Sequence, residues 1–248
     1  MPALITLPRL VWGDGPRRAL LVHGLGSSAA LMWRIGAALA DAGWQATAVD
    51  LRGHGDAPRA LDYSVAAYAD IAAARPEGGG EWDAVIGHSL GGASTVVAAT
   101  TASGWARRLV LIDPAIHVAG RDEGIIRRSQ KRAFAAPDVE SVRAEHPDWH
   151  PQDVELKVDA VLRASRWAVE QTSVQNQPWD VRAQAAQLDI PTHIVGADPE
   201  VYSLFTGELA DSVLENPHIT MSVVAGAGHS PHRDRPEETI RQILEALS

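Results

Sequence analysis

The fold is decided by the stretch DAVIGHSLGG, which occupies residues 83–92. Its first half is an apolar strand pattern, and the Gly-x-Ser-x-Gly that follows leads into a helix of small residues. A sharp strand-to-helix turn of this kind holds its central residue in strained geometry, and Gly87 and Gly91 let strand and helix approach each other closely. We therefore expect the Ser89 hydroxyl to project from the carboxyl end of a buried strand.

Short apolar runs on either side of this stretch alternate with helical patterns. Strands that are apolar on both faces and separated by helices indicate a mostly parallel sheet covered on two sides, so the predicted fold class is α/β. Residues 84–106 lack charged side chains, but their glycines, serines and threonines favour a buried strand and helix over a membrane span. The predicted strands are residues 19–22, 46–49, 84–86, 109–112, 193–195 and 220–224, and the predicted helices are 29–42, 65–74, 92–102 and 237–247.

The alternation pauses between Pro114 and Leu188, where helical patterns follow one another. About 70 residues is too long for a simple connection, so we expect a helical cap insertion at 114–188 in a core of residues 1–113 and 189–248. The insertion holds Phe134 and three tryptophans that either pack the cap or line an apolar substrate pocket. These tryptophans are Trp149, Trp167 and Trp179.

Composition excludes several kinds of function. The chain has 248 residues, no cysteine and a formal charge of −9. The absence of cysteine excludes disulfides, thiolate metal sites and a cysteine nucleophile, and the net negative charge argues against nucleic acid and anionic membrane partners. Residues 1–12 show no signal-peptide pattern, so we expect a cytoplasmic protein. No pattern indicates an oligomeric state.

A second strand ends in a His-Gly loop, LLVHGLG at residues 20–26. Together with residues 83–92, this loop resembles the α/β-hydrolase superfamily. The resemblance implies that the turn at Ser89 is the family's nucleophile elbow. The resemblance implies that Ser89 is the nucleophile and that the backbone N–H groups of Leu25 and Leu90 form the oxyanion hole. His23 and the three tryptophans are candidate substrate-binding residues.

The family's order of nucleophile, acid and histidine implies that the base comes last. The stretch VVAGAGHSPH at residues 223–232 matches the family's terminal signature and points to His229 as the base. His232 is the competitor three residues later. The stretch VDLRGHG at residues 49–55 is similar to a family loop that is usually structural, so we assign His54 to loop hydrogen bonding.

The acid is the least determined member of the predicted triad. Asp198 follows a late strand, where the family commonly places its carboxylate, and is our choice. Many relatives have one more residue before the aspartate, which leaves Glu200 as a substitute. Asp113, at the end of the strand 109–112, is the other alternative because some family members carry the acid after the preceding strand.

These roles predict a serine hydrolase that cleaves a small or medium carboxylic ester without metal or cofactor. The same triad would serve a thioesterase, lactonase, carbon–carbon bond hydrolase, acyltransferase, hydroxynitrile lyase or cofactor-free haloperoxidase, and a slow-turnover ligand receptor shares the fold. Serine at the elbow disfavours epoxide hydrolase and dehalogenase chemistry. A basic face on residues 124–134 would favour an ester with a free carboxylate if it turned toward the site. Its side chains are Arg127, Arg128, Lys131 and Arg132.

Overall fold

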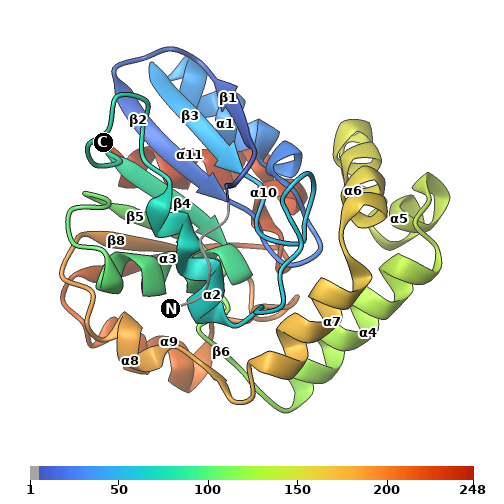
Figure 1. The fold of residues 1–248 in the computed structure, drawn as a ribbon. Helices are drawn as coiled ribbons and strands as arrows, with labels where there is room; N and C mark the ends of the chain where they lie inside the picture. Colours follow the sequence, from blue (N-terminus) through green and yellow to red (C-terminus); the bar gives the residue numbers. More distant parts are fainter. Residues whose placement is uncertain (1–5) are drawn as a thin grey trace.

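The computed structural model describes residues 6–248, and within them the chain forms a seven-stranded sheet (Figure 1). The edge strand β1 runs antiparallel to β3, and every other neighbouring pair is parallel. The strands, in their order across the sheet, are β1 (Arg9–Trp12), β3 (Trp44–Val49), β2 (Arg17–Val22), β4 (Ala84–His88), β5 (Leu109–Ile112), β8 (Thr192–Ala197) and β9 (Ile219–Val224). The α/β class is confirmed.

Helices cover both faces of this sheet. They are η1 (Ala29–Met32), α1 (Trp33–Asp41), α2 (Val65–Tyr68), η2 (Ala69–Ala73), α3 (Leu90–Thr101), α8 (Arg182–Ala185), α9 (Gly207–Leu214), α10 (Pro231–Asp234) and α11 (Pro236–Ala246). Helices α1 and α11 share one apolar cluster, while α2, α3 and α9 contribute to the other. The predicted strands and helices of the core are therefore confirmed, and β1 is an addition.

Strand β2 shows why the sheet needs two helical layers. Leu20 and Val22 belong to one apolar cluster, and Ala19 and Leu21 belong to the other. Alternate side chains of a strand point to opposite faces, so a strand that is apolar throughout must be covered on both sides.

Residues 114–188, which we call the helical insertion, lie between β5 and β8 in the chain, and their last helix, α8, packs with the core. Figure 1 shows the four longer helices of the insertion standing together beside the sheet, on the side toward which the parallel strands point. A short antiparallel ladder, which the sequence did not reveal, joins the two ends of the insertion. The elements before α8 are β6 (His117–Val118), α4 (Arg121–Ala135), α5 (Val139–Glu145), α6 (Pro151–Arg163), α7 (Arg166–Gln175) and β7 (Trp179–Asp180).

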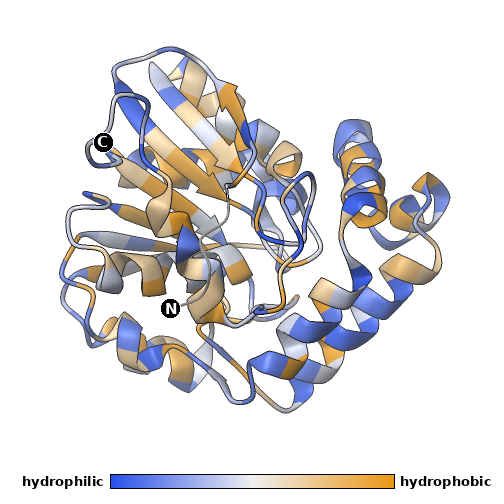
Figure 2. Cartoon of the chain, viewed as in Figure 1, coloured by the Kyte–Doolittle hydropathy of each residue, from blue (hydrophilic) through white to orange (hydrophobic). Residues whose placement is uncertain are grey.

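Helix α4 carries the predicted basic face, and Figure 2 shows hydrophilic residues dominating this helix. Arg127 pairs with Glu123 one turn earlier, and Arg132 Nε lies 3.2 Å from Glu145 Oε1. Both arginines are more than 60% exposed. Their charge is thus partly neutralised at the surface.

The charge-free stretch 84–106 forms β4 and α3, as predicted. Within residues 6–248, no helix combines the length and the apolar character that crossing a membrane requires. The expectation about a signal peptide concerns in part residues 1–5, which lie outside the described residues, and the cytoplasmic location stays a prediction.

Candidate active site

Ser89 occupies the sharp turn between β4 and α3 that the sequence predicts. Its backbone has φ 54° and ψ −116°, a region that non-glycine residues seldom adopt. A Cβ atom on Gly91 would lie 2.3 Å from the carbonyl oxygen of Val22, and one on Gly87 would lie 2.7 Å from the carbonyl oxygen of Gly91. Glycine is therefore required at both positions because neighbouring backbones pass too close for any side chain.

Three side chains from distant parts of the chain form one hydrogen-bonded line. His229 Nε2 lies 2.9 Å from Ser89 Oγ, and His229 Nδ1 lies 2.6 Å from Asp113 Oδ2. Asp113 is fully buried, whereas about a quarter of the His229 side chain remains accessible. The arrangement is that of a nucleophile, a base and an orienting carboxylate.

Asp113 follows directly on β5 and is held by several donors besides the imidazole. The hydroxyl of Ser203 donates to its Oδ1 at 2.6 Å, and the N–H groups of Leu204 and Phe205 donate to the same carboxylate at 3.1 and 3.2 Å. Its φ is 35°, so its own backbone is also in the left-handed region. A buried carboxylate with this many donors is held in one orientation.

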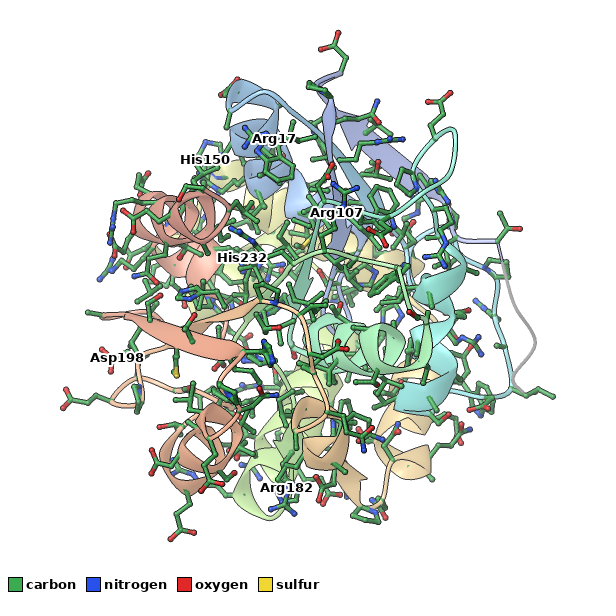
Figure 3. All side chains as sticks on the ribbon, turned by 90° about the vertical axis from the view of Figure 1, so that its left-hand side faces the viewer. Arg17, Arg107, His150, Arg182, Asp198 and His232 are labelled. Atoms are coloured by element: carbon green, nitrogen blue, oxygen red, sulfur yellow. The ribbon has the colours of Figure 1, made fainter. Side chains whose placement is uncertain are left out.

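The structure does not bring Asp198, our choice for the triad acid, to His229 and places the alternative Asp113 there instead. Asp198 Oδ2 accepts a hydrogen bond of 2.7 Å from Gly226 N and its Oδ1 one of 2.9 Å from Glu200 N, and these bonds, the former above all, lower the pKa of the carboxyl. Figure 3 shows Asp198 at the periphery of the molecule. This carboxylate links the loop after β8 to the turn after β9 by a hydrogen bond. Glu200, the alternative acid, is exposed.

Sheet order explains why Asp113 takes the place next to His229. Strand β5 lies directly beside β4, with Ile112 paired with His88, so the residues that follow the two strands are neighbours at one edge of the sheet. The sequence offered Asp113 as an alternative, but it did not reveal which strand end the histidine loop would reach.

The predicted oxyanion-hole residues, Leu25 and Leu90, line the same cavity as Ser89. Leu90 is the first residue of α3, where a backbone N–H has no partner within the helix. Gly26 N, next to Leu25, donates to His54 Nε2 at 3.0 Å, which fixes the loop that carries Leu25.

The cavity has a volume of about 420 Å³ and lies between the loops that carry Ser89 and His229 and the helical insertion. Trp149 and Trp179 line it, as expected for two of the candidate substrate-binding residues. Further lining side chains come from α4, α6 and α10, among them Ile125, Ile126, Gln130, Lys157 and Arg233.

His23 and Trp167, the other two candidates, do not line this cavity. His23 is fully buried: its Nδ1–H donates to Gly24 O at 2.7 Å, its Nε2 accepts from Leu51 N at 3.1 Å, and burial lowers its pKa to about 4. Trp167 is 46% exposed and packs edge-on against Tyr63. The structure thus brings neither ring to the cavity, because backbone groups occupy the ring nitrogens of His23 and Trp167 faces outward from α7.

The remaining histidines near Ser89 have structural surroundings. His54 accepts from Gly26 N and donates to Arg52 O, in line with its assignment to the loop, and burial lowers its pKa to about 3. His232 is buried against the His88 ring, and His88 Nε2 donates to His229 O at 2.8 Å. Within residues 6–248, no group of three or more histidine, aspartate or glutamate side chains could hold a metal ion.

The sequence missed four charged cavity residues, namely Lys157, Arg233, Glu145 and Asp234. Lys157 is one of two lysines in the chain, but nothing in its local pattern distinguishes it from an ordinary helix-surface cation. Arg233 lies within four residues of His229, and that proximity is the one signal that could have pointed to it.

Comparison with known proteins agrees with this geometry. The rice protein named probable esterase PIR7A (Oryza sativa subsp. indica) is 35% identical over 119 residues, and lipase LipV of Mycobacterium tuberculosis is 31% identical over 126 residues. These matches cover 45% and 50% of this chain and only 44% and 46% of the relatives' own lengths.

The structure resembles the N-formylmaleamic acid deformylase of Pseudomonas putida S16, with a TM-score of 0.79 and 23% identity over 98% of this chain and 99% of the other. At that identity the likeness concerns the fold. The model of the alpha/beta hydrolase family matches residues 19–242, which is most of the chain. The protein therefore belongs to the alpha/beta hydrolase family.

Proposed function

We propose that the protein is a serine hydrolase that cleaves a small or medium carboxylic ester through an acyl-enzyme. The observation that carries this proposal is the hydrogen-bonded line from Ser89 Oγ through the His229 ring to Asp113 at the edge of a cavity. The similarity to proteins named as an esterase and a lipase supports an ester as the substrate class.

In the first half of the reaction, Ser89 Oγ attacks the ester carbonyl while His229 Nε2 takes the hydroxyl proton. The C–O bond to the alcohol then breaks, and His229 returns the proton to the departing alcohol. Asp113, rather than Asp198, holds the imidazole with Nδ1 protonated and stabilises its charged form. In the second half, His229 activates a water molecule that hydrolyses the acyl-enzyme and regenerates Ser89.

The negative charge that develops on the carbonyl oxygen needs donors that are already in place. The backbone N–H groups of Leu25 and Leu90 would supply them, and the N-terminal end of α3 adds a favourable dipole. One such donor contributes about 3–4 kcal/mol in comparable sites.

The helical insertion, residues 114–188, would act as a cap that selects the substrate. Trp149 and Trp179 give the cavity two large rings, and each indole N–H already has an acceptor, Asp234 Oδ1 for Trp149 and Ala115 O for Trp179. Their remaining surface is apolar, which suits a partly apolar ester.

The test is turnover of 4-nitrophenyl butyrate by Ser89→Ala. We expect a loss on the order of 10⁶-fold in kcat, as when the nucleophile of a triad is removed. The matched control is Ser212→Ala, since Ser212 is exposed on α9 and its hydroxyl donates to Leu209 O within the same helix. Retention of most activity by Ser89→Ala would refute the proposal.

A further inference from the structure

Two cations line the cavity beside the Ser89 site. Arg233 belongs to α10 and is only 5% exposed, and Lys157 belongs to α6. Lys157 Nζ donates to Gly26 O at 2.8 Å, and Arg233 Nη2 lies 3.4 Å from Ser27 Oγ. The two cations therefore contact Gly26 and Ser27, the two residues that follow Leu25 in the chain.

Neither cation has an acidic partner. Among residues 6–248, no carboxylate oxygen lies within 4 Å of a charged nitrogen of Lys157 or Arg233, and Arg233 Nε has no hydrogen-bond acceptor. The nearby acids are committed elsewhere: Asp153 binds Arg34 and Trp33, and Asp234 binds Trp149 and Gly228. Glu145 binds Arg132.

Two neighbouring positive charges in a largely buried site repel each other, and the acids of the same lining, Glu145 and Asp234, offset this repulsion only from beyond 4 Å. Burial first, then the neighbouring Arg233, lowers the pKa of Lys157 to about 8, and burial lowers that of Arg233 to about 10. Both groups are still charged at neutral pH. The face of Trp149 under the Arg233 guanidinium, 5.2 Å away, holds it in place without neutralising it.

We propose that the cavity binds an ester that carries a second, free carboxylate, and that Arg233 and Lys157 bind this carboxylate. The inference rests on the proposed ester hydrolysis and names its substrate class. The Cα atoms of Leu25 and Ser27 lie at most about 7.6 Å apart, since consecutive Cα atoms are about 3.8 Å apart. A chain of a few atoms between the ester carbonyl carbon and the carbon of the free carboxylate therefore suits the site, as in half-esters of short dicarboxylic acids.

The arginines of α4, which the sequence suggested for such a role, are poorer candidates. Arg127 and Arg132 lie at the surface and already pair with Glu123 and Glu145. Arg132 also lines the cavity but is exposed and paired, whereas Arg233 is buried, Lys157 is half-buried, and neither has an acidic partner within 4 Å in the described residues.

The experiment compares monoethyl succinate with its uncharged isostere, ethyl 4-methylpentanoate, by proton release. We expect wild-type kcat/KM to favour the anionic ester by at least about tenfold. Arg233→Met and Lys157→Met should each lower this preference by about ten- to a hundredfold, the range for losing a hydrogen bond to a charged group. The matched control, Arg107→Met, removes an exposed arginine that pairs with Glu81 and should leave the preference unchanged.

A second measurement separates this inference from the proposed function. Succinate binding is measured by calorimetry in Ser89→Ala and in Ser89→Ala combined with Lys157→Met. Binding that weakens about tenfold or more in the double variant supports the anion site, even if no ester is turned over or Arg233→Met does not fold. Equal turnover of both esters by the wild type, or no succinate binding to Ser89→Ala, overturns the inference and leaves the ester hydrolase in place.

Discussion

Asp113 Oδ2 lies 2.6 Å from His229 Nδ1, although 116 positions separate the two residues in the chain. The parallel strand β5 ends beside β4, and the loop after β9 brings the imidazole to the same edge. Asp198 lies in the loop after β8, and its carboxylate oxygens accept hydrogen bonds from the N–H groups of Gly226 and Glu200. The two aspartates are thus a natural matched pair for testing which one supports the histidine.

Asp113→Asn should lower kcat for ester hydrolysis about 10⁴-fold, because an amide can no longer fix the imidazole tautomer or stabilise its charged form. Asp198→Asn should stay within about threefold of the wild type, since its carboxylate does not contact His229. Steady-state kinetics on one ester for both variants is the measurement. A severe loss in Asp198→Asn together with a mild one in Asp113→Asn would reverse our assignment.

Much of the fold could be predicted because local signals agreed with one another. The run before Ser89 is apolar on both faces and ends in glycines that the close approach of Val22 and Gly91 requires. Ser89 and His229 follow from such local patterns, and the structure places the two side chains 2.9 Å apart.

The acid and the cavity residues could not be chosen in the same way, because they depend on contacts between distant segments. Asp113 and Asp198 both follow an apolar strand, and only the order of strands in the sheet distinguishes them. His23 looked available, but Gly24 and Leu51 occupy its ring nitrogens. Lys157 becomes a cavity residue only because α6 packs so that its amine reaches Gly26.

The preference for an anionic ester should depend on pH through Lys157. Burial lowers the pKa of its amine to about 8, so the cation is present below pH 8 and is lost as the pH rises through that value. The charged groups that act on it are Arg233 and Glu145. Its neighbours His23, His54 and His146 have pKa values lowered by burial.

The ratio of kcat/KM for monoethyl succinate to that for ethyl 4-methylpentanoate should therefore fall between pH 7 and pH 9. Any effect of pH on the chemical step that the two esters share affects both rates and cancels in this ratio. The Lys157→Met variant should show a lower ratio with no fall across the same range. A ratio that falls equally in the wild type and the variant would exclude Lys157 as its cause.

Acid should destabilise the fold through its buried neutral histidines. Burial lowers the pKa of His23 to about 4 and that of His54 to about 3, and each ring accepts a backbone N–H that a protonated ring could not accept. The unfolded chain takes up these protons near pH 6.5, so the stabilisation is present above pH 6.5 and is lost as the pH falls toward 4 and 3.

Near pH 5 each of these two histidines should lower the free energy of unfolding by about 1.4 kcal/mol for every unit of pH decrease. Urea denaturation at pH 7, 6 and 5 measures this dependence. His54→Gln keeps an acceptor for Gly26 N. It should reduce the loss of unfolding free energy per pH unit by the contribution of one histidine, about 1.4 kcal/mol. A free energy of unfolding that stays constant from pH 7 to pH 5 would contradict this account of the two rings.

The central claim is that the elbow presents Ser89 Oγ as a nucleophile activated by His229, and a fluorophosphonate probe tests it most directly. Intact-mass and peptide mass spectrometry should find one covalent adduct per chain, located on Ser89, and none in folded Ser89→Ala. An adduct on another serine, or a folded wild-type protein whose Ser89 remains unmodified, would contradict the account.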